Sequence, residues 1–246
     1  MKPVALKEGI ILKTTDYKDQ AVLVNVLTPN GLENFIIKGA KKISGGTRLL
    51  ANALSKIVFS CTESEGLNTI IEGSCKDNYI TIKSNIEKML NAYAIMEKIL
   101  TFSSQVTNND LFYHFVEEIL DLLSSDLSED LVVILFDIKL TFLIGIGPEL
   151  KTCVKCGKSV DNGVFSIYNG GCFCRSCKIM ESYDLNEEET KALTLLYLIK
   201  LKMVDKKLEA IVKDNLKKLL WVIDLYYQKH LDFTSKAKIV MKEMHN

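Results

Sequence analysis

The sequence is poor in the residues from which catalytic sites are most often built. Its three histidines, His114, His230 and His245, are scattered, and none lies near a plausible nucleophile in the sequence. Gly45-Gly46 is not followed by the Lys-Ser or Lys-Thr of a phosphate-binding loop. Acidic pairs such as Glu117-Glu118 are typical of helix faces. These absences predict a protein that is not an enzyme, has no catalytic residue and takes no small-molecule substrate.

Long apolar runs are also missing. No stretch of about 18 apolar residues is free of charge, which argues against a transmembrane helix. Met1-Lys2-Pro3 leads straight into strand-like sequence, without the apolar region of a signal peptide. Four of the seven cysteines have the spacing of a metal site, which suits a reducing compartment better than a disulfide framework. We expect a cytoplasmic protein with no membrane partner.

The chain has no excess of charge, with 31 basic and 31 acidic residues. The charges are unevenly distributed, because residues 81–150 carry four basic and eleven acidic side chains, a net charge of −7. The segments on either side are mildly basic. This pattern indicates different surfaces for different partners, or solvated faces that bind nothing.

The sequence predicts an α+β fold. Five short strand-like runs cover the first 80 residues and favour a small barrel of the OB-fold type. From about Asn85 the apolar period changes to that of helices. The strands are expected at 8–13, 20–27, 34–39, 55–62 and 68–74, and the helices at 86–102, from 109, at 129–144, 187–202, 208–230 and 235–244. The expected domains are an OB-fold at 1–80, a helical domain at 81–150 and 183–246, and an inserted four-cysteine module at 151–182.

That module has two cysteine pairs, Cys153-x2-Cys156 and Cys174-x2-Cys177. Two-residue spacing lets both thiolates of a pair reach one tetrahedral zinc ion, and four thiolates leave no open position for chemistry. We therefore expect one structural zinc. Two disulfides or free thiols are the alternatives. Cys172 could pair with Cys174 instead, but the repeated x2 spacing favours Cys174 and Cys177 as ligands.

The order of these parts resembles the RecO family of bacterial recombination mediators, over essentially the whole chain. The matching segments are Gly9-Ile10-Ile11-Leu12-Lys13, Lys38-Gly39-Ala40-Lys41-Lys42, Gly145-Ile146-Gly147-Pro148, the cysteine array, His230-Leu231 and Lys236-Ala237-Lys238. The last segment departs from the Lys-Ser-Arg more usual in that family. The loop after Lys42 is also less basic, with Arg48 as the only arginine of the first 80 residues.

The resemblance implies a non-catalytic protein of DNA repair and recombination. Such a protein binds single- and double-stranded DNA, anneals complementary strands and partners with RecR. It also binds the acidic tail of single-stranded DNA-binding protein (SSB) and helps to load RecA, which places it at the nucleoid. The OB-fold would carry DNA binding, with Lys38, Lys41, Lys42 and Arg48 as phosphate contacts. Tyr17, Phe35 and Phe59 are the aromatic residues there, and Phe35 and Phe59 are expected in the core.

Lys139 is the only cation between Lys98 and Lys151 and lies in the most apolar helical segment. It could reach water along an apolar surface, or it could receive the acidic, phenylalanine-ended SSB tail at the edge of a groove. Two other classes of function remain open. One is a zinc-stabilised interaction adaptor that binds DNA only weakly, which the neutral net charge favours. The other is a nucleic-acid enzyme with a dispersed site.

Overall fold

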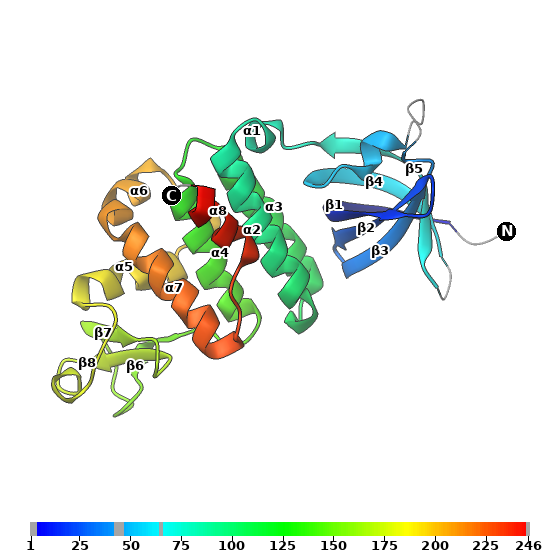
Figure 1. Cartoon of the computed structure of the whole chain (residues 1–246). Helices are drawn as coiled ribbons and strands as arrows, with labels where there is room; N and C mark the ends of the chain where they lie inside the picture. Colours follow the sequence, from blue (N-terminus) through cyan, green and yellow to red (C-terminus); the bar gives the residue numbers. More distant parts are fainter. Residues whose placement is uncertain (1–3, 42–46, 64–65, 245–246) are drawn as a thin grey trace. The chain divides into compact units, whose positions relative to one another are not determined.

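The computed structural model describes residues 4–41, 47–63 and 66–244, without the side chains of Leu49, Lys242 and Met244. Contacts within the chain divide it into two compact units, Met1–Leu120 and Asp121–Asn246, each with its own packed interior. Figure 1 shows the strands and helices of both. The four-part domain division predicted from the sequence remains a proposal.

The N-terminal unit begins with a closed five-stranded barrel of the order β1-β2-β3-β5-β4. Neighbouring strands are antiparallel except β3 and β5, which are parallel. The OB-like barrel predicted from the sequence is confirmed. Its strands are β1 (Val4–Tyr17), β2 (Ala21–Thr28), β3 (Gly31–Lys38), β4 (Ser55–Thr62) and β5 (Asn68–Asp77).

Alternation of apolar and polar residues determines which side chains fill the barrel. In β4, every second residue from Ser55 to Cys61 is buried. Phe35 and Phe59 are fully buried, with ring centroids 5.0 Å apart in an edge-to-face arrangement. Both rings therefore belong to the core, as expected, and cannot stack on a base.

One short helix lies between two of the barrel strands and further helices follow the barrel, the last of which begins in the N-terminal unit and ends in the C-terminal unit. They are η1 (Arg48–Ala51), α1 (Ile80–Lys83), α2 (Ile86–Phe102), η2 (Ser103–Gln105) and α3 (Asn109–Ser124). The Asn85 side chain caps α2 by accepting a hydrogen bond from the backbone N–H of Lys88. Lys56 of β4 pairs with Glu117 of α3, which fastens that helix to the barrel wall.

The C-terminal unit packs helices around α4 (Glu129–Leu143), whose residues from Leu131 to Ile138 are all buried. It also contains a three-stranded sheet of the order β6-β8-β7. The remaining elements are β6 (Glu149–Cys153), β7 (Gly163–Ser166), β8 (Gly171–Cys174), η3 (Lys178–Met180), α5 (Glu187–Leu198), η4 (Leu201–Met203), α6 (Lys206–Val212), η5 (Lys213–Asn215), α7 (Leu216–Leu231) and α8 (Lys236–Met244). None of the described helices is long and apolar enough to cross a bilayer.

Two helices are shorter than the sequence predicted. The helix expected over 187–202 ends at Leu198, because Ile199 and Lys200 adopt extended backbone. The helix expected over 208–230 is two helices, α6 and α7, separated by the 3-10 turn of η5. Asp214 and Asn215 lie in that turn, and both are weak helix formers.

A partly buried group of three charged side chains connects helices of the C-terminal unit. Asp137 of α4 is fully buried, and the Lys238 ammonium of α8 lies 3.3 Å from its carboxylate. The same ammonium lies 2.5 Å from Asp224 of α7. Burial works against the charged form of Lys238, but the attraction of the two carboxylates outweighs it and raises the pKa of the ammonium. The ion group therefore joins three helices at one point.

Candidate metal centre and nucleic-acid interface

The structure brings the four predicted cysteines to one point. The Sγ atoms of Cys153, Cys156, Cys174 and Cys177 all lie within 4.8 Å of one another, and those of Cys156 and Cys174 are 3.7 Å apart. A tetrahedral zinc with bonds of about 2.3 Å has sulfur–sulfur edges of about 3.8 Å. No pair is at disulfide distance, and all seven cysteines are free. The donor set fits a metal ion that prefers four soft ligands.

Two similar turns position these thiols. Cys153 ends β6 and Cys174 ends β8, and the second cysteine of each pair lies in the turn that follows. The N–H of Gly157 donates to the Cys153 carbonyl at 2.8 Å, and the N–H of Cys177 donates to the Cys174 carbonyl at 3.0 Å. Gly157 has φ +71°, a conformation that glycine adopts without strain. Each turn thus folds its second thiol back toward the first.

The thiols of Cys153 and Cys177 have pKa shifts of opposite sign. Burial opposes ionisation of Cys153, but backbone N–H groups near its sulfur outweigh this effect and lower its pKa to about 6. Burial and hydrogen bonds to the neighbouring thiols raise the pKa of Cys177 to about 12. A bound divalent cation would favour the thiolate at all four positions.

Cys172 lies outside the cluster. It is fully buried on β8 opposite Phe165, and burial raises the pKa of its thiol to about 12. Its side chain belongs to the interior of the small sheet.

The cysteine module is fastened to the helices of its own unit by α7. Tyr226 donates from its hydroxyl to the carbonyl of Ile146 at 2.8 Å, and its ring lies 6.1 Å from that of Phe165 on β7. The Nε2 of His230 lies 2.8 Å from the carbonyl oxygen of Ile167. His230 therefore has a structural position in the module.

The predicted DNA-binding cations lie at one end of the barrel, as far as the structure describes them. Lys38 ends β3 and is exposed, and Arg48 is exposed at the start of η1. The Thr47 hydroxyl donates to the Lys38 carbonyl at 3.2 Å, which connects these two segments. Lys41 lies 3.1 Å from the Asp16 carboxylate. Lys42 falls outside the described residues.

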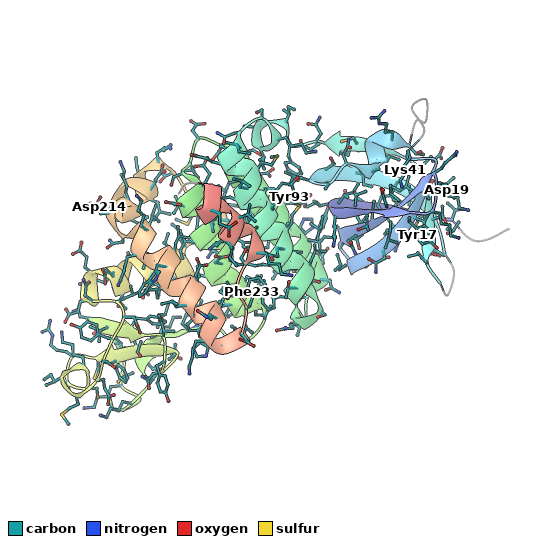
Figure 2. The ribbon with its side chains drawn as sticks, viewed as in Figure 1. Tyr17, Asp19, Lys41, Tyr93, Asp214 and Phe233 are labelled. Atoms are coloured by element: carbon teal, nitrogen blue, oxygen red, sulfur yellow. The ribbon has the colours of Figure 1, made fainter. Side chains whose placement is uncertain are left out.

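One aromatic side chain accompanies these cations. Tyr17 faces Ala21 on β2, and Ala21 in turn faces Lys38 on β3, so the three side chains lie in a row on one face. Figure 2 shows Tyr17, Asp19 and Lys41 gathered at this end of the barrel. We call Tyr17, Lys38, Lys41 and Arg48 the barrel pole.

Lys139 has partners that the sequence did not reveal. Its ammonium donates to the carbonyls of Tyr197 at 3.1 Å and Ile199 at 2.6 Å, at the C-terminal end of α5. These carbonyls have no intrahelical donor, so Lys139 caps the helix. Burial lowers the pKa of its ammonium. Beside it the Phe142 ring is 65% exposed, a feature that apolar periodicity alone could not distinguish from a core position.

Comparison with known proteins identifies the family. The model of the N-terminal part of recombination protein O matches residues 1–79, and that of its C-terminal part matches residues 83–238. The chain belongs to the RecO family.

Individual RecO proteins match over nearly their full length. The DNA repair protein RecO of Bacillus pumilus is 27% identical over 245 residues, which is 96% of this chain and 93% of that protein. The DNA repair protein RecO of Oceanobacillus iheyensis is 27% identical over 243 residues, with 96% and 92% covered. That of Bacillus subtilis is 26% identical over 243 residues, with 96% and 93% covered. The resemblance drawn from the sequence is thus confirmed, and the chain is a member of a DNA repair and recombination family.

Proposed function

We propose that the protein is a non-catalytic recombination mediator that binds single- and double-stranded DNA through the barrel pole. In this role it anneals complementary strands and acts with RecR and SSB to load RecA, in the cytoplasm at the nucleoid. Membership of the RecO family supports the role, and the row of Tyr17, Ala21 and Lys38 is the observation that carries the DNA site.

The physical basis is an aromatic ring close to several cationic side chains. The Tyr17 ring is half-buried and has the Lys18 ammonium 5.3 Å from its centre. A base that stacks on it therefore lies among cations, while the phosphates on either side meet Lys38 and Lys41. Lys41 is paired with Asp16, but the Asp16 side chain is 84% exposed, so this ion pair contributes little and a phosphate can replace the carboxylate. Binding of this kind does not depend on the base sequence of the DNA, because the contacts are to phosphates and to the faces of bases.

A charge-reversal series tests this site. We expect Lys38→Glu with Lys41→Glu to weaken binding of single-stranded DNA at low salt. Each lost phosphate contact lowers the slope of log affinity against log salt by about 0.7, so two contacts lower it by about 1.4. Fluorescence anisotropy of a labelled oligonucleotide measures both quantities. Lys191→Glu, at an exposed position on α5, is the matched control and should bind as the wild type does.

An unchanged affinity and slope in the double variant would place the DNA site elsewhere. Weak binding by the wild type itself, with no dependence on salt, would favour the alternative of a zinc-stabilised adaptor. Metal-dependent turnover of a nucleic acid would show an enzyme instead.

The four thiols are proposed to hold one zinc ion with a structural role. Zinc suits a closed tetrahedral set of four thiolates, since no position remains for water or substrate. The small sheet around them has a compact interior of few residues, among them Val164 and Phe173. Metal binding would therefore supply much of the stability that this interior cannot.

We also propose that the SSB tail binds beside Lys139. The Phe142 ring lies 6.2 Å from that of Tyr197, and Leu198 is 53% exposed next to it, which gives an apolar surface at the end of α5. The Lys139 ammonium has three donors and gives two to carbonyls, so one can face a carboxylate. A terminal phenylalanine on this surface would account for binding of an acidic peptide by an acidic segment of the chain.

Phe142→Ala tests the proposed peptide-binding surface without removing the Lys139 ammonium that caps α5. We expect it to weaken binding of an SSB tail peptide by about tenfold, because an aromatic contact of this kind contributes about 1 kcal/mol or more. Calorimetry with the peptide measures this, and Tyr93→Ala, an exposed aromatic residue on α2, is the control. If Phe142→Ala binds the peptide as tightly as the wild type does, the peptide does not bind at this surface, and Lys139 serves only to cap α5.

A further inference from the structure

The exposed face of α7 carries a regular set of aromatic, apolar and cationic side chains. Lys218, Trp221, Leu225 and Lys229 follow one another at intervals of three or four residues, so they lie on one face. All of α7 is described, and its single acidic residue, Asp224, pairs with Lys238. The Trp221 side chain is 50% exposed although it is the only tryptophan of the chain. The face is therefore cationic as well as aromatic.

Each ring on this surface has an ammonium over it. The Lys218 ammonium lies 4.6 Å from the centre of the Trp221 ring. The Lys229 ammonium lies 4.7 Å from the centre of the Tyr168 ring, which projects from the turn between β7 and β8 and is 76% exposed. The cysteine module thus extends the surface begun by α7. We call Lys218, Trp221, Leu225, Lys229 and Tyr168 the α7 strip.

A cavity of about 570 Å³ adjoins the Tyr168 end of the strip. Tyr168, Leu225 and Lys229 line it together with Tyr183 and Gln228. Two carboxylates, those of Asp184 and Asp232, also line it, and that of Asp184 accepts a hydrogen bond from the N–H of Ile167 at 2.7 Å. Its walls thus combine ring faces with an amide and carboxylates, which suit the amino groups of a nucleic-acid base.

We propose that the α7 strip binds a single strand of nucleic acid, with bases on Trp221 and Tyr168 and phosphates at Lys218 and Lys229. The repeated pairing of a ring with an ammonium favours this occupant, because a polyanion with flat bases presents the same alternation. The acidic side chains of a peptide would use the cations but would leave both rings without a stacking partner. The cavity would then take a base at one end of the strand.

The strip has the length that this occupant needs. From Lys218 to Lys229 the helix rises about 16 Å, which spans about five nucleotides at the 3.4 Å spacing of a stacked strand. The inference extends the proposed function, since it adds to the barrel pole a second surface for DNA on a separate unit of the chain. A protein with two such surfaces can hold two strands at once, as annealing requires.

Trp221 itself reports on this surface, because no other tryptophan contributes to the fluorescence. Titration of the full chain with a short oligodeoxycytidine at low salt should quench Trp221. Tyr168→Ala should weaken the affinity read from this signal about tenfold, through loss of one stacked base. Lys218→Glu should lower it further and reduce its salt dependence. Tyr93→Ala is the control, with a tyrosine 46% exposed on α2, and should leave the titration unchanged.

The barrel-pole variant separates the two sites. Lys38→Glu with Lys41→Glu should lose total affinity by anisotropy yet keep the full Trp221 quenching at saturating oligonucleotide. If the oligonucleotide binds by anisotropy without changing Trp221, the strip is not a nucleic-acid site, and the barrel pole is unaffected by that result. Loss of the Trp221 response in the barrel-pole variant would also overturn the inference. So would quenching by an acidic peptide but not by the oligonucleotide.

Discussion

Cys172 and Cys174 are separated by a single residue on β8, yet only one of them lies among the clustered thiols. The Cys174 sulfur lies 3.7 Å from that of Cys156, whereas Cys172 is fully buried opposite Phe165. Residues two positions apart on a strand share a face, so alternation does not distinguish Cys172 from Cys174. Cys174 is the last residue of β8, and the turn that begins there brings Cys177 back toward it. The identity of a ligand is therefore set here by the turn.

This difference gives a prediction about metal content. Cys174→Ser should reduce bound zinc from about one ion per chain to nearly none and lower the melting temperature, because three thiolates hold zinc far more weakly than four. Cys172→Ser should keep the zinc. Elemental analysis of both purified variants measures the result. Full zinc in Cys174→Ser, or loss of zinc in Cys172→Ser, would reject the ligand set.

At the scale of helices and strands, sequence patterns predicted correctly the elements that are determined by residues close together in the chain. The five strands and the cysteine turns follow from alternation and spacing, so both could be found in the sequence. The cap of α5 could not, because its donor is the ammonium of Lys139, which lies 60 residues away from Ile199 in the chain. The pairing of Tyr168 with Lys229 is equally long-range, since the two residues meet only when the module folds against α7.

For the cationic sites too, the sequence did not reveal contacts between residues that are distant in the chain. The sequence identified Lys38 and Arg48 as a cluster because both flank one loop. It did not place Tyr17 beside them, since that contact depends on the register of three strands. Nothing in the sequence marked Trp221 as exposed. The structure places it on the outer face of α7, together with Lys218, Leu225 and Lys229.

At the scale of the whole chain, two units have separate cores, and the last helix belongs to the second. Lys238 joins α8 to Asp137 and Asp224, residues 101 and 14 positions earlier in the chain. Asp137 is fully buried, and the Lys238 ammonium from near the chain's end stabilises its charge. The raised pKa of Lys238 means that this stabilisation is present below the ordinary lysine pKa and is lost as the pH rises through the higher pKa of the folded state.

Lys238→Met should therefore lower the free energy of unfolding of the C-terminal unit by about 3 kcal/mol, because it removes a cation that pairs with a fully buried carboxylate. Thermal unfolding followed by Trp221 fluorescence reports that unit, since Trp221 lies on α7. Lys213→Met, at an exposed position of η5, is the control and should change the melting temperature little. The N-terminal unit has its own core, so DNA binding by the barrel pole at room temperature should survive in the Lys238 variant. A melting temperature equal to that of wild type would show that Asp137 does not need the ammonium, and loss of barrel-pole binding would show that the two units do not fold independently.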